Sequence, residues 1–169
     1  MALDAYVCCD CIEKGRIRAP HPFPERLCIG ADGSPDVWTE DLSSDEECEM
    51  FDTHWAWQWA EACEHPRCHL VEHRLGNISL IASLRGVVAR LATEGEWPIL
   101  RQKVIYSGIH CADWLSREKV ELLALELGEV PERDWAPLNK KEALWLRVFL
   151  EQMEELIAAS RIVNKPIVF

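Results

Sequence analysis

Cysteine and histidine residues concentrate in two short segments of this chain and could together bind a metal ion. Cys8 and Cys11 have the Cys-x-x-Cys spacing of half a zinc site. The second segment supplies Cys63, His65 and Cys68 but lacks a second Cys-x-x-Cys. Thiolate sulfur and imidazole nitrogen are the ligands that tetrahedral zinc prefers, whereas a buried thiol in a strand is also an ordinary core residue. We expect a protein without a cofactor, and the alternative is a regulatory or interaction domain stabilised by one structural zinc.

The run from Tyr106 to Asp113 is the second place where the residue types could do chemistry. Ser107, His110 and Asp113 are the types found in a catalytic triad, and a thiol at Cys63 or Cys111 could pair with a histidine. Triad groups converge from different elements, so close sequence neighbours rarely form one. Nucleophile-elbow, phosphate-loop and His-Glu-x-x-His patterns are also missing from the sequence.

We therefore expect no catalytic residues and no enzymatic activity, with a Cys-His hydrolase or transferase as a second alternative. The same run has a structural interpretation that needs no reaction. Tyr106, His110 and Asp113 can hydrogen-bond one another inside the fold, as buried polar groups require. We interpret these three residues as a structural polar network.

An acidic segment carries the strongest functional hypothesis. From Asp32 to Asp52 the chain has nine carboxylates and no Lys or Arg, and three tryptophans follow at once. A concentrated negative field speeds encounter with a basic protein, and tryptophans are frequent interface anchors. We place Trp55 and Trp59 in the core and expect Trp57 to be partly exposed. The predicted partner-binding residues are Asp36, Trp38, Glu40, Asp41, Asp45, Glu46, Glu47, Glu49, Asp52 and Trp57.

The charge balance excludes several classes of partner. The net charge is −11 and the pI is about 5.0, so the chain lacks the excess of Lys and Arg over acidic residues that nucleic-acid phosphates and anionic membranes demand. The N-terminus lacks the basic start of a signal peptide, and no apolar stretch is long enough to cross a bilayer. We expect a cytoplasmic protein whose eight cysteines are reduced thiols.

The pattern of elements predicts an α+β fold in one globular domain, residues 1–169, with an acidic loop at about 32–47. The expected architecture is about four helices packed on a small, mostly antiparallel sheet of four or five short strands. Helices are predicted over about 44–63, 77–93, 116–128 and 140–160. Strands are predicted over 4–9, 26–29, 37–39, 69–74 and 166–169, with 106–114 as a loop.

Four stretches spread along the chain resemble a family of small uncharacterised bacterial proteins. These stretches are Met1–Cys11, Ala62–Pro66, Tyr106–Asp113 and Lys165–Phe169. That family has no assigned activity, so the resemblance implies no functional residue. In size, acidity and lack of catalytic motifs the chain is also similar to the immunity proteins of bacterial polymorphic-toxin systems. This similarity implies a non-catalytic protein that binds and neutralises a basic toxin.

Overall fold

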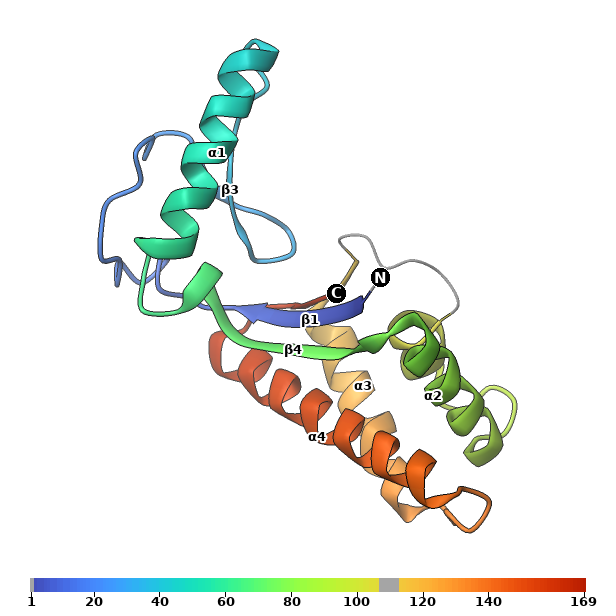
Figure 1. Cartoon of the computed structure of the whole chain (residues 1–169). Coiled ribbons are helices and arrows are strands. Elements are labelled where there is room, and N and C mark those ends of the chain that lie inside the picture. Colours follow the sequence, from blue (N-terminus) through green and yellow to red (C-terminus); the bar gives the residue numbers. More distant parts are fainter. Residues whose placement is uncertain (1, 107–112) are drawn as a thin grey trace.

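A four-stranded antiparallel sheet separates the molecule into two parts (Figure 1). The computed structural model describes residues 2–106 and 113–169. Strand β1 (Ala2–Cys8) lies between β4 (His69–Asn77) and β6 (Ile167–Val168), and β5 (Trp114–Leu115) forms the far edge. Strands β1 and β4 pair along their whole length, from Ala2 opposite Asn77 to Cys8 opposite His69. The two ends of the chain therefore meet in the middle of the sheet.

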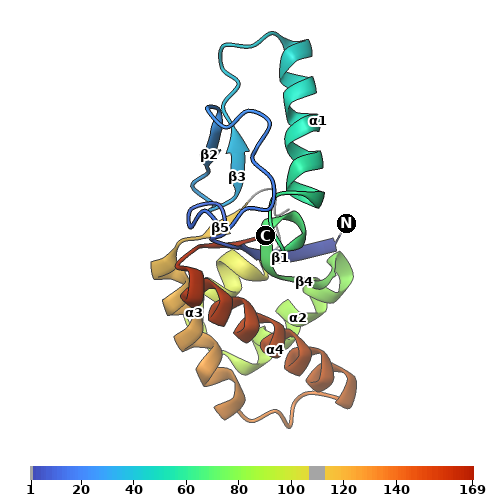
Figure 2. The same cartoon turned by 90° about the vertical axis from the view of Figure 1, so that its left-hand side faces the viewer.

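Three helices cover one face of this sheet and form the larger part, which we call the body (Figures 1 and 2). They are α2 (Ile78–Leu91), α3 (Arg117–Glu129) and α4 (Lys140–Val163). Asn side chains cap two of them, since Asn77 accepts from the Leu80 N–H and Asn139 from the Lys141 and Glu142 N–H groups. A π-helical turn (Leu100–Val104) and a 3₁₀ turn (Val130–Glu132) complete the connections.

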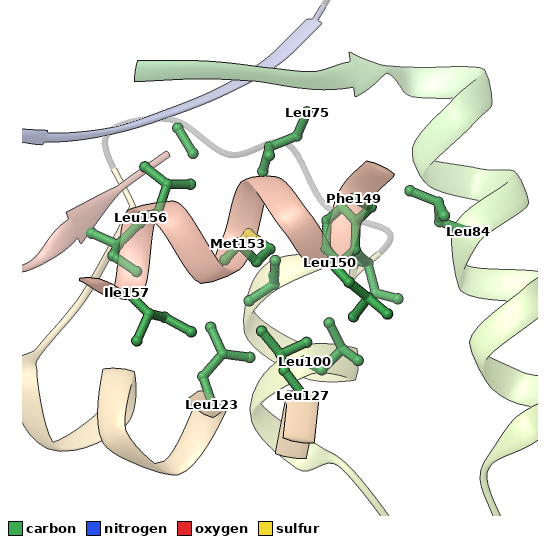
Figure 3. Packing of buried hydrophobic residues seen from close by; sticks show 14 of the residues in the cluster. Leu75, Leu84, Leu100, Leu123, Leu127, Phe149, Leu150, Met153, Leu156 and Ile157 are labelled. Atoms are coloured by element: carbon green, nitrogen blue, oxygen red, sulfur yellow. The ribbon is translucent and has the colours of Figure 1, made fainter. Parts of the chain in front are cut away.

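The body is held together by one continuous apolar core (Figure 3). Leu75 comes from β4, Leu84 from α2, Leu123 from α3, and Phe149 and Met153 from α4. Their spacing in α4 places one apolar stripe against the sheet and the other two helices, as amphipathic packing requires.

That intervening segment, residues 9–68, forms the second part, which we call the arm (Figure 2). It contains the hairpin of β2 (Leu27–Ile29) and β3 (Pro35–Val37), helix α1 (Ser44–Ala60) and a 3₁₀ turn (Pro66–Cys68). Helix α1 packs mainly against β3 and the 3₁₀ turn, and it extends away from the sheet on the side opposite the body helices (Figure 1). A small second core lies at the root of the arm, formed by Cys9, Cys11, Trp57, Ala62, Cys63 and Cys68.

The predicted α+β class, with four α-helices and a small antiparallel sheet, is confirmed. Two details differ. The strands around 26–39 form a separate hairpin rather than joining the main sheet, and Trp114–Leu115 adds an edge strand where a loop is predicted. The acidic stretch 32–47 is only partly a loop, because it includes β3 and the first turn of α1.

Among the described residues, no helix combines the length and apolar character needed to span a lipid bilayer.

Candidate functional site

Helix α1 carries a concentration of negative charge that the rest of the molecule does not neutralise. It contains five carboxylates and no Lys or Arg. Within the described parts of the chain, none of the five takes part in an ion pair, whereas several carboxylates of the body each pair with an arginine. Glu46 instead accepts from the Ser43 N–H at the start of the helix, and Glu47 accepts from the Thr39 hydroxyl. The five residues are Asp45, Glu46, Glu47, Glu49 and Asp52.

The tryptophans of α1 have the opposite arrangement to the one predicted. Trp57 is the buried indole, with 2% of its surface exposed, whereas Trp55 and Trp59 are 62% and 59% exposed. The expectation that Trp55 and Trp59 fill the core was therefore wrong, as was the partial exposure of Trp57. The two exposed tryptophans therefore lie on the same helix as the five carboxylates without ion pairs.

Hydrogen bonds explain why the less apolar face of α1 is the buried one. The buried residues are Met50, His54 and Trp57, which share one helical stripe. His54 Nε2 lies 3.2 Å from the Pro35 carbonyl oxygen, and Trp57 Nε1 donates to the Ala19 carbonyl at 2.9 Å. Because the arm satisfies these polar atoms, the stripe can be buried at little cost, and the other indoles remain outside.

The other predicted partner-binding residues lie in β3 and in the loop between β3 and α1. Trp38 is exposed, and the guanidinium of Arg26 lies 5.8 Å from its ring centroid. Arg26 also donates to both carboxylate oxygens of Asp41, at 2.7 and 3.1 Å, so this acidic residue is neutralised locally. Asp36 and Glu40 are exposed. The unneutralised charge is therefore carried chiefly by α1 rather than by the loop before it.

A shallow groove of ≈ 300 Å³ opens beside the first half of α1. Acidic and apolar side chains line it together with Arg26, whose guanidinium is paired with Asp41, so Glu46 and Glu49 remain to receive a basic side chain with an apolar stem. The lining residues are Phe23, Arg26, Leu42, Glu46, Glu49 and Met50.

The root of the arm brings four potential metal ligands together. Cys9 and Cys11 follow the end of β1, while Cys63 and His65 follow the end of α1. Cys9 Sγ lies 3.6 Å from Cys63 Sγ, and Cys11 Sγ lies 3.4 Å from His65 Nδ1. All four ligand atoms lie within 4.8 Å of one another. Three of the five predicted metal candidates are thus brought into one cluster.

The other two candidates lie outside this ligand group, and Cys9 was missed. Cys8 is fully buried as the last residue of β1, opposite His69 of β4. Cys68 is also buried, but it ends the 3₁₀ turn, where Arg67 and Cys68 both have left-handed backbone conformations (φ 57° and 58°). The spacing actually used is Cys-x-Cys and Cys-x-His, which the search for Cys-x-x-Cys overlooked.

Burial keeps the thiols of this cluster protonated at neutral pH when no metal replaces the proton. Desolvation raises the pKa of Cys63 to about 11, and it also raises the pKa of Cys11. The pKa of Cys9 is raised first by its hydrogen bond with Cys68 and then by burial. Nucleophilic catalysis requires the thiolate, so these thiols are poorly suited to it.

The predicted polar network is present in part. The Tyr106 hydroxyl donates to Asp113 Oδ2 at 2.6 Å, and this bond raises the pKa of Tyr106. It lies at the surface rather than inside the fold. His110, together with Ser107 and Cys111, lies outside the described residues.

Comparison with known proteins identifies no relative. No protein-family model matches this chain, and no curated protein or solved structure is significantly similar to it.

Proposed function

We propose that this chain is a non-catalytic binding protein, an immunity protein that neutralises a basic bacterial toxin in the cytoplasm. Helix α1 is the part that contacts the toxin. The observation that carries the proposal is the presence of five carboxylates without ion pairs among the described residues on a helix that extends from the body. Unpaired charge of one sign on a protruding element accelerates encounter with an oppositely charged protein.

The exposed indoles supply the second requirement of a tight interface. Charge mainly sets the association rate and the orientation, whereas desolvated aromatic anchors set much of the binding free energy. Trp55 and Trp59 are exposed on the same helix as the carboxylates. These two residues therefore replace Trp57 in the proposed interface.

The proposal predicts that co-expression with the product of the adjacent gene yields a complex that dissociates as salt is raised. Reversing two charges, Glu49→Lys with Asp52→Lys, should slow association by about tenfold and flatten its dependence on ionic strength. Both residues are exposed and neither caps the helix. Stopped-flow mixing at several salt concentrations measures both quantities.

A matched variant on the body controls for the change in net charge. Glu151→Lys with Glu154→Lys adds the same four positive units to exposed positions of α4. We expect the association rate to change much less with this pair. Equal effects of the two pairs would show that only net charge matters, and the assignment of the interface to α1 would then be rejected.

A further inference from the structure

We propose that Cys9, Cys11, Cys63 and His65 bind one zinc ion, which fastens the root of the arm to the end of β1. This site goes beyond toxin binding, because its role is to shape the chain rather than to contact a partner. Its ligand set differs from the one that sequence spacing suggests, with Cys9 in place of Cys8.

The distances between the ligand atoms fit a tetrahedral centre. Bonds of about 2.3 Å to sulfur and about 2.0–2.1 Å to nitrogen place two sulfurs about 3.8 Å apart and sulfur and nitrogen about 3.5 Å apart. The observed Cys9–Cys63 separation is 3.6 Å, and His65 Nδ1 lies 3.4 Å from Cys11 Sγ and 3.9 Å from Cys63 Sγ. No pair exceeds 4.8 Å, so closure around a metal would shorten the longest pair by only about 1 Å.

The types and the number of the ligand atoms indicate which metal would bind and what its role would be. Three thiolates and one imidazole suit zinc, while magnesium and calcium prefer oxygen. Four protein ligands also fill the tetrahedron, which is the arrangement of structural rather than catalytic zinc. The three cysteines are buried and His65 is half-buried, so the centre would be shielded from solvent.

Local backbone structure presents the ligands from both segments. The Cys9 N–H donates to the Cys68 carbonyl at 2.7 Å, and the Arg16 N–H donates to the Cys11 carbonyl at 2.7 Å, which fixes the turn that carries the first two thiols. On the other side, the Cys68 N–H donates to the His65 carbonyl at 3.0 Å. The two left-handed residues of that turn, Arg67 and Cys68, are in a strained backbone conformation, and a metal bond nearby would help to maintain it.

A disulfide is the competing chemistry for the same sulfurs. Cys9 and Cys63 are close enough to be oxidised after a small shift, because a disulfide needs sulfurs about 2.05 Å apart. The two outcomes differ in proton and electron balance. Zinc binding releases three thiol protons, oxidises nothing and leaves a centre of net charge −1. A disulfide would remove two electrons to an external oxidant.

Cobalt provides a direct test on the full-length chain. Reduced protein stripped with a chelator is titrated with Co²⁺, whose sulfur-to-metal charge transfer and visible bands report tetrahedral thiolate ligation. We expect saturation at one Co²⁺ per chain and displacement by one Zn²⁺. Absence of a thiolate charge-transfer band, in protein whose circular dichroism shows folded body helices, would overturn the proposal. So would a Cys9–Cys63 disulfide in protein purified without reductant.

Single substitutions then identify the ligands. Cys11→Ser and His65→Asn should each lower zinc affinity by at least tenfold or abolish stoichiometric binding, while Cys48→Ser, at an exposed position of α1, should not. Cys8→Ser decides between the two ligand sets. Retention of one zinc by this variant supports the site as proposed, whereas its loss with the body folded would replace Cys9 by Cys8 and reject our assignment.

Discussion

The ammonium group of Lys165 donates to the carbonyl oxygen of Cys9 at 2.7 Å and thereby joins the end of the chain to its beginning. It also donates to the Gly33 carbonyl at 2.9 Å and pairs with Glu13 at 2.6 Å. Lys165 is 7% exposed, and it follows Asn164, whose left-handed conformation ends α4. One buried cation thus holds the body, the turn after β1 and the hairpin turn of the arm together.

Replacement of this cation should destabilise the protein. Lys165→Met keeps the apolar stem but leaves two buried carbonyls and Glu13 without their donor, which costs about 2–4 kcal/mol by the usual penalties for unsatisfied buried groups. We expect a lower midpoint of urea unfolding, measured by the fluorescence of the arm tryptophans and by circular dichroism.

The control is Lys119→Met, which removes a lysine from an exposed position of α3. It should alter the free energy of unfolding by less than about 0.5 kcal/mol, as surface substitutions usually do. If the two variants were equally stable, the hydrogen bonds of Lys165 would not contribute to the junction.

The fold class and most element boundaries were predictable because local signals agree with the final structure. The Asn77 and Asn139 caps mark the starts of α2 and α4, and both act as caps in the structure. Strand β5 was not predictable, because its two residues are ordered by pairing with β6 and not by a β-prone pattern of their own.

The candidate sites were only partly predictable, for two physical reasons. Amphipathic reasoning buries the most apolar stripe of a helix, but α1 projects from the body and buries the stripe whose polar atoms find partners, including His54. The Cys-x-x-Cys spacing predicts Cys8 as a metal ligand. However, β1 ends at Cys8, and the turn that follows places Cys9 beside the other three ligand residues instead. Both outcomes depend on tertiary contacts.

The two kinds of tryptophan in α1 should respond differently to truncation. Trp57→Ala removes a buried indole and its hydrogen bond to Ala19, and it should lower the free energy of unfolding by about 3–5 kcal/mol. Trp55→Ala removes an exposed indole and should change stability by less than about 0.5 kcal/mol. Chemical denaturation measures both, and a destabilising Trp55→Ala would contradict the assigned face of α1.

Three hydrogen bonds join the imidazoles of His21 and His54 in a chain inside the arm. The Phe23 N–H donates to His21 Nδ1 at 3.0 Å, so His21 carries its proton on Nε2. This nitrogen lies 3.0 Å from His54 Nδ1, which must accept, and His54 Nε2 donates to the Pro35 carbonyl. A proton added to His54 Nδ1 would face the N–H of His21 Nε2, so the His54 ring must be neutral for the chain of hydrogen bonds to persist.

The stability of the arm should therefore fall in mild acid. Burial, and then the neighbouring His21, hold the pKa of His54 below the 6.5 of an unfolded histidine. Below pH 6.5 His54 is protonated in the unfolded chain but stays neutral in the folded arm. The free energy of unfolding therefore decreases as the pH falls below 6.5, and it is fully restored above pH 6.5. Burial lowers the pKa of His69 as well, and this histidine acts in the same direction. Urea titrations between pH 7.5 and 5 measure the slope.

His54→Gln separates the imidazole chain from the other titrating groups. An amide can still donate to Pro35 and accept from His21, but it does not bind a proton in this range. We expect the variant to lose less stability between pH 7.5 and 5 than the natural chain, with the remaining slope due chiefly to His69. Trp57, one of eight tryptophans, contributes to the change in fluorescence, because its ring contacts His21 edge-on with centroids 4.7 Å apart. An unchanged slope in His54→Gln would mean that the buried histidine pair does not govern the response of the arm to acid.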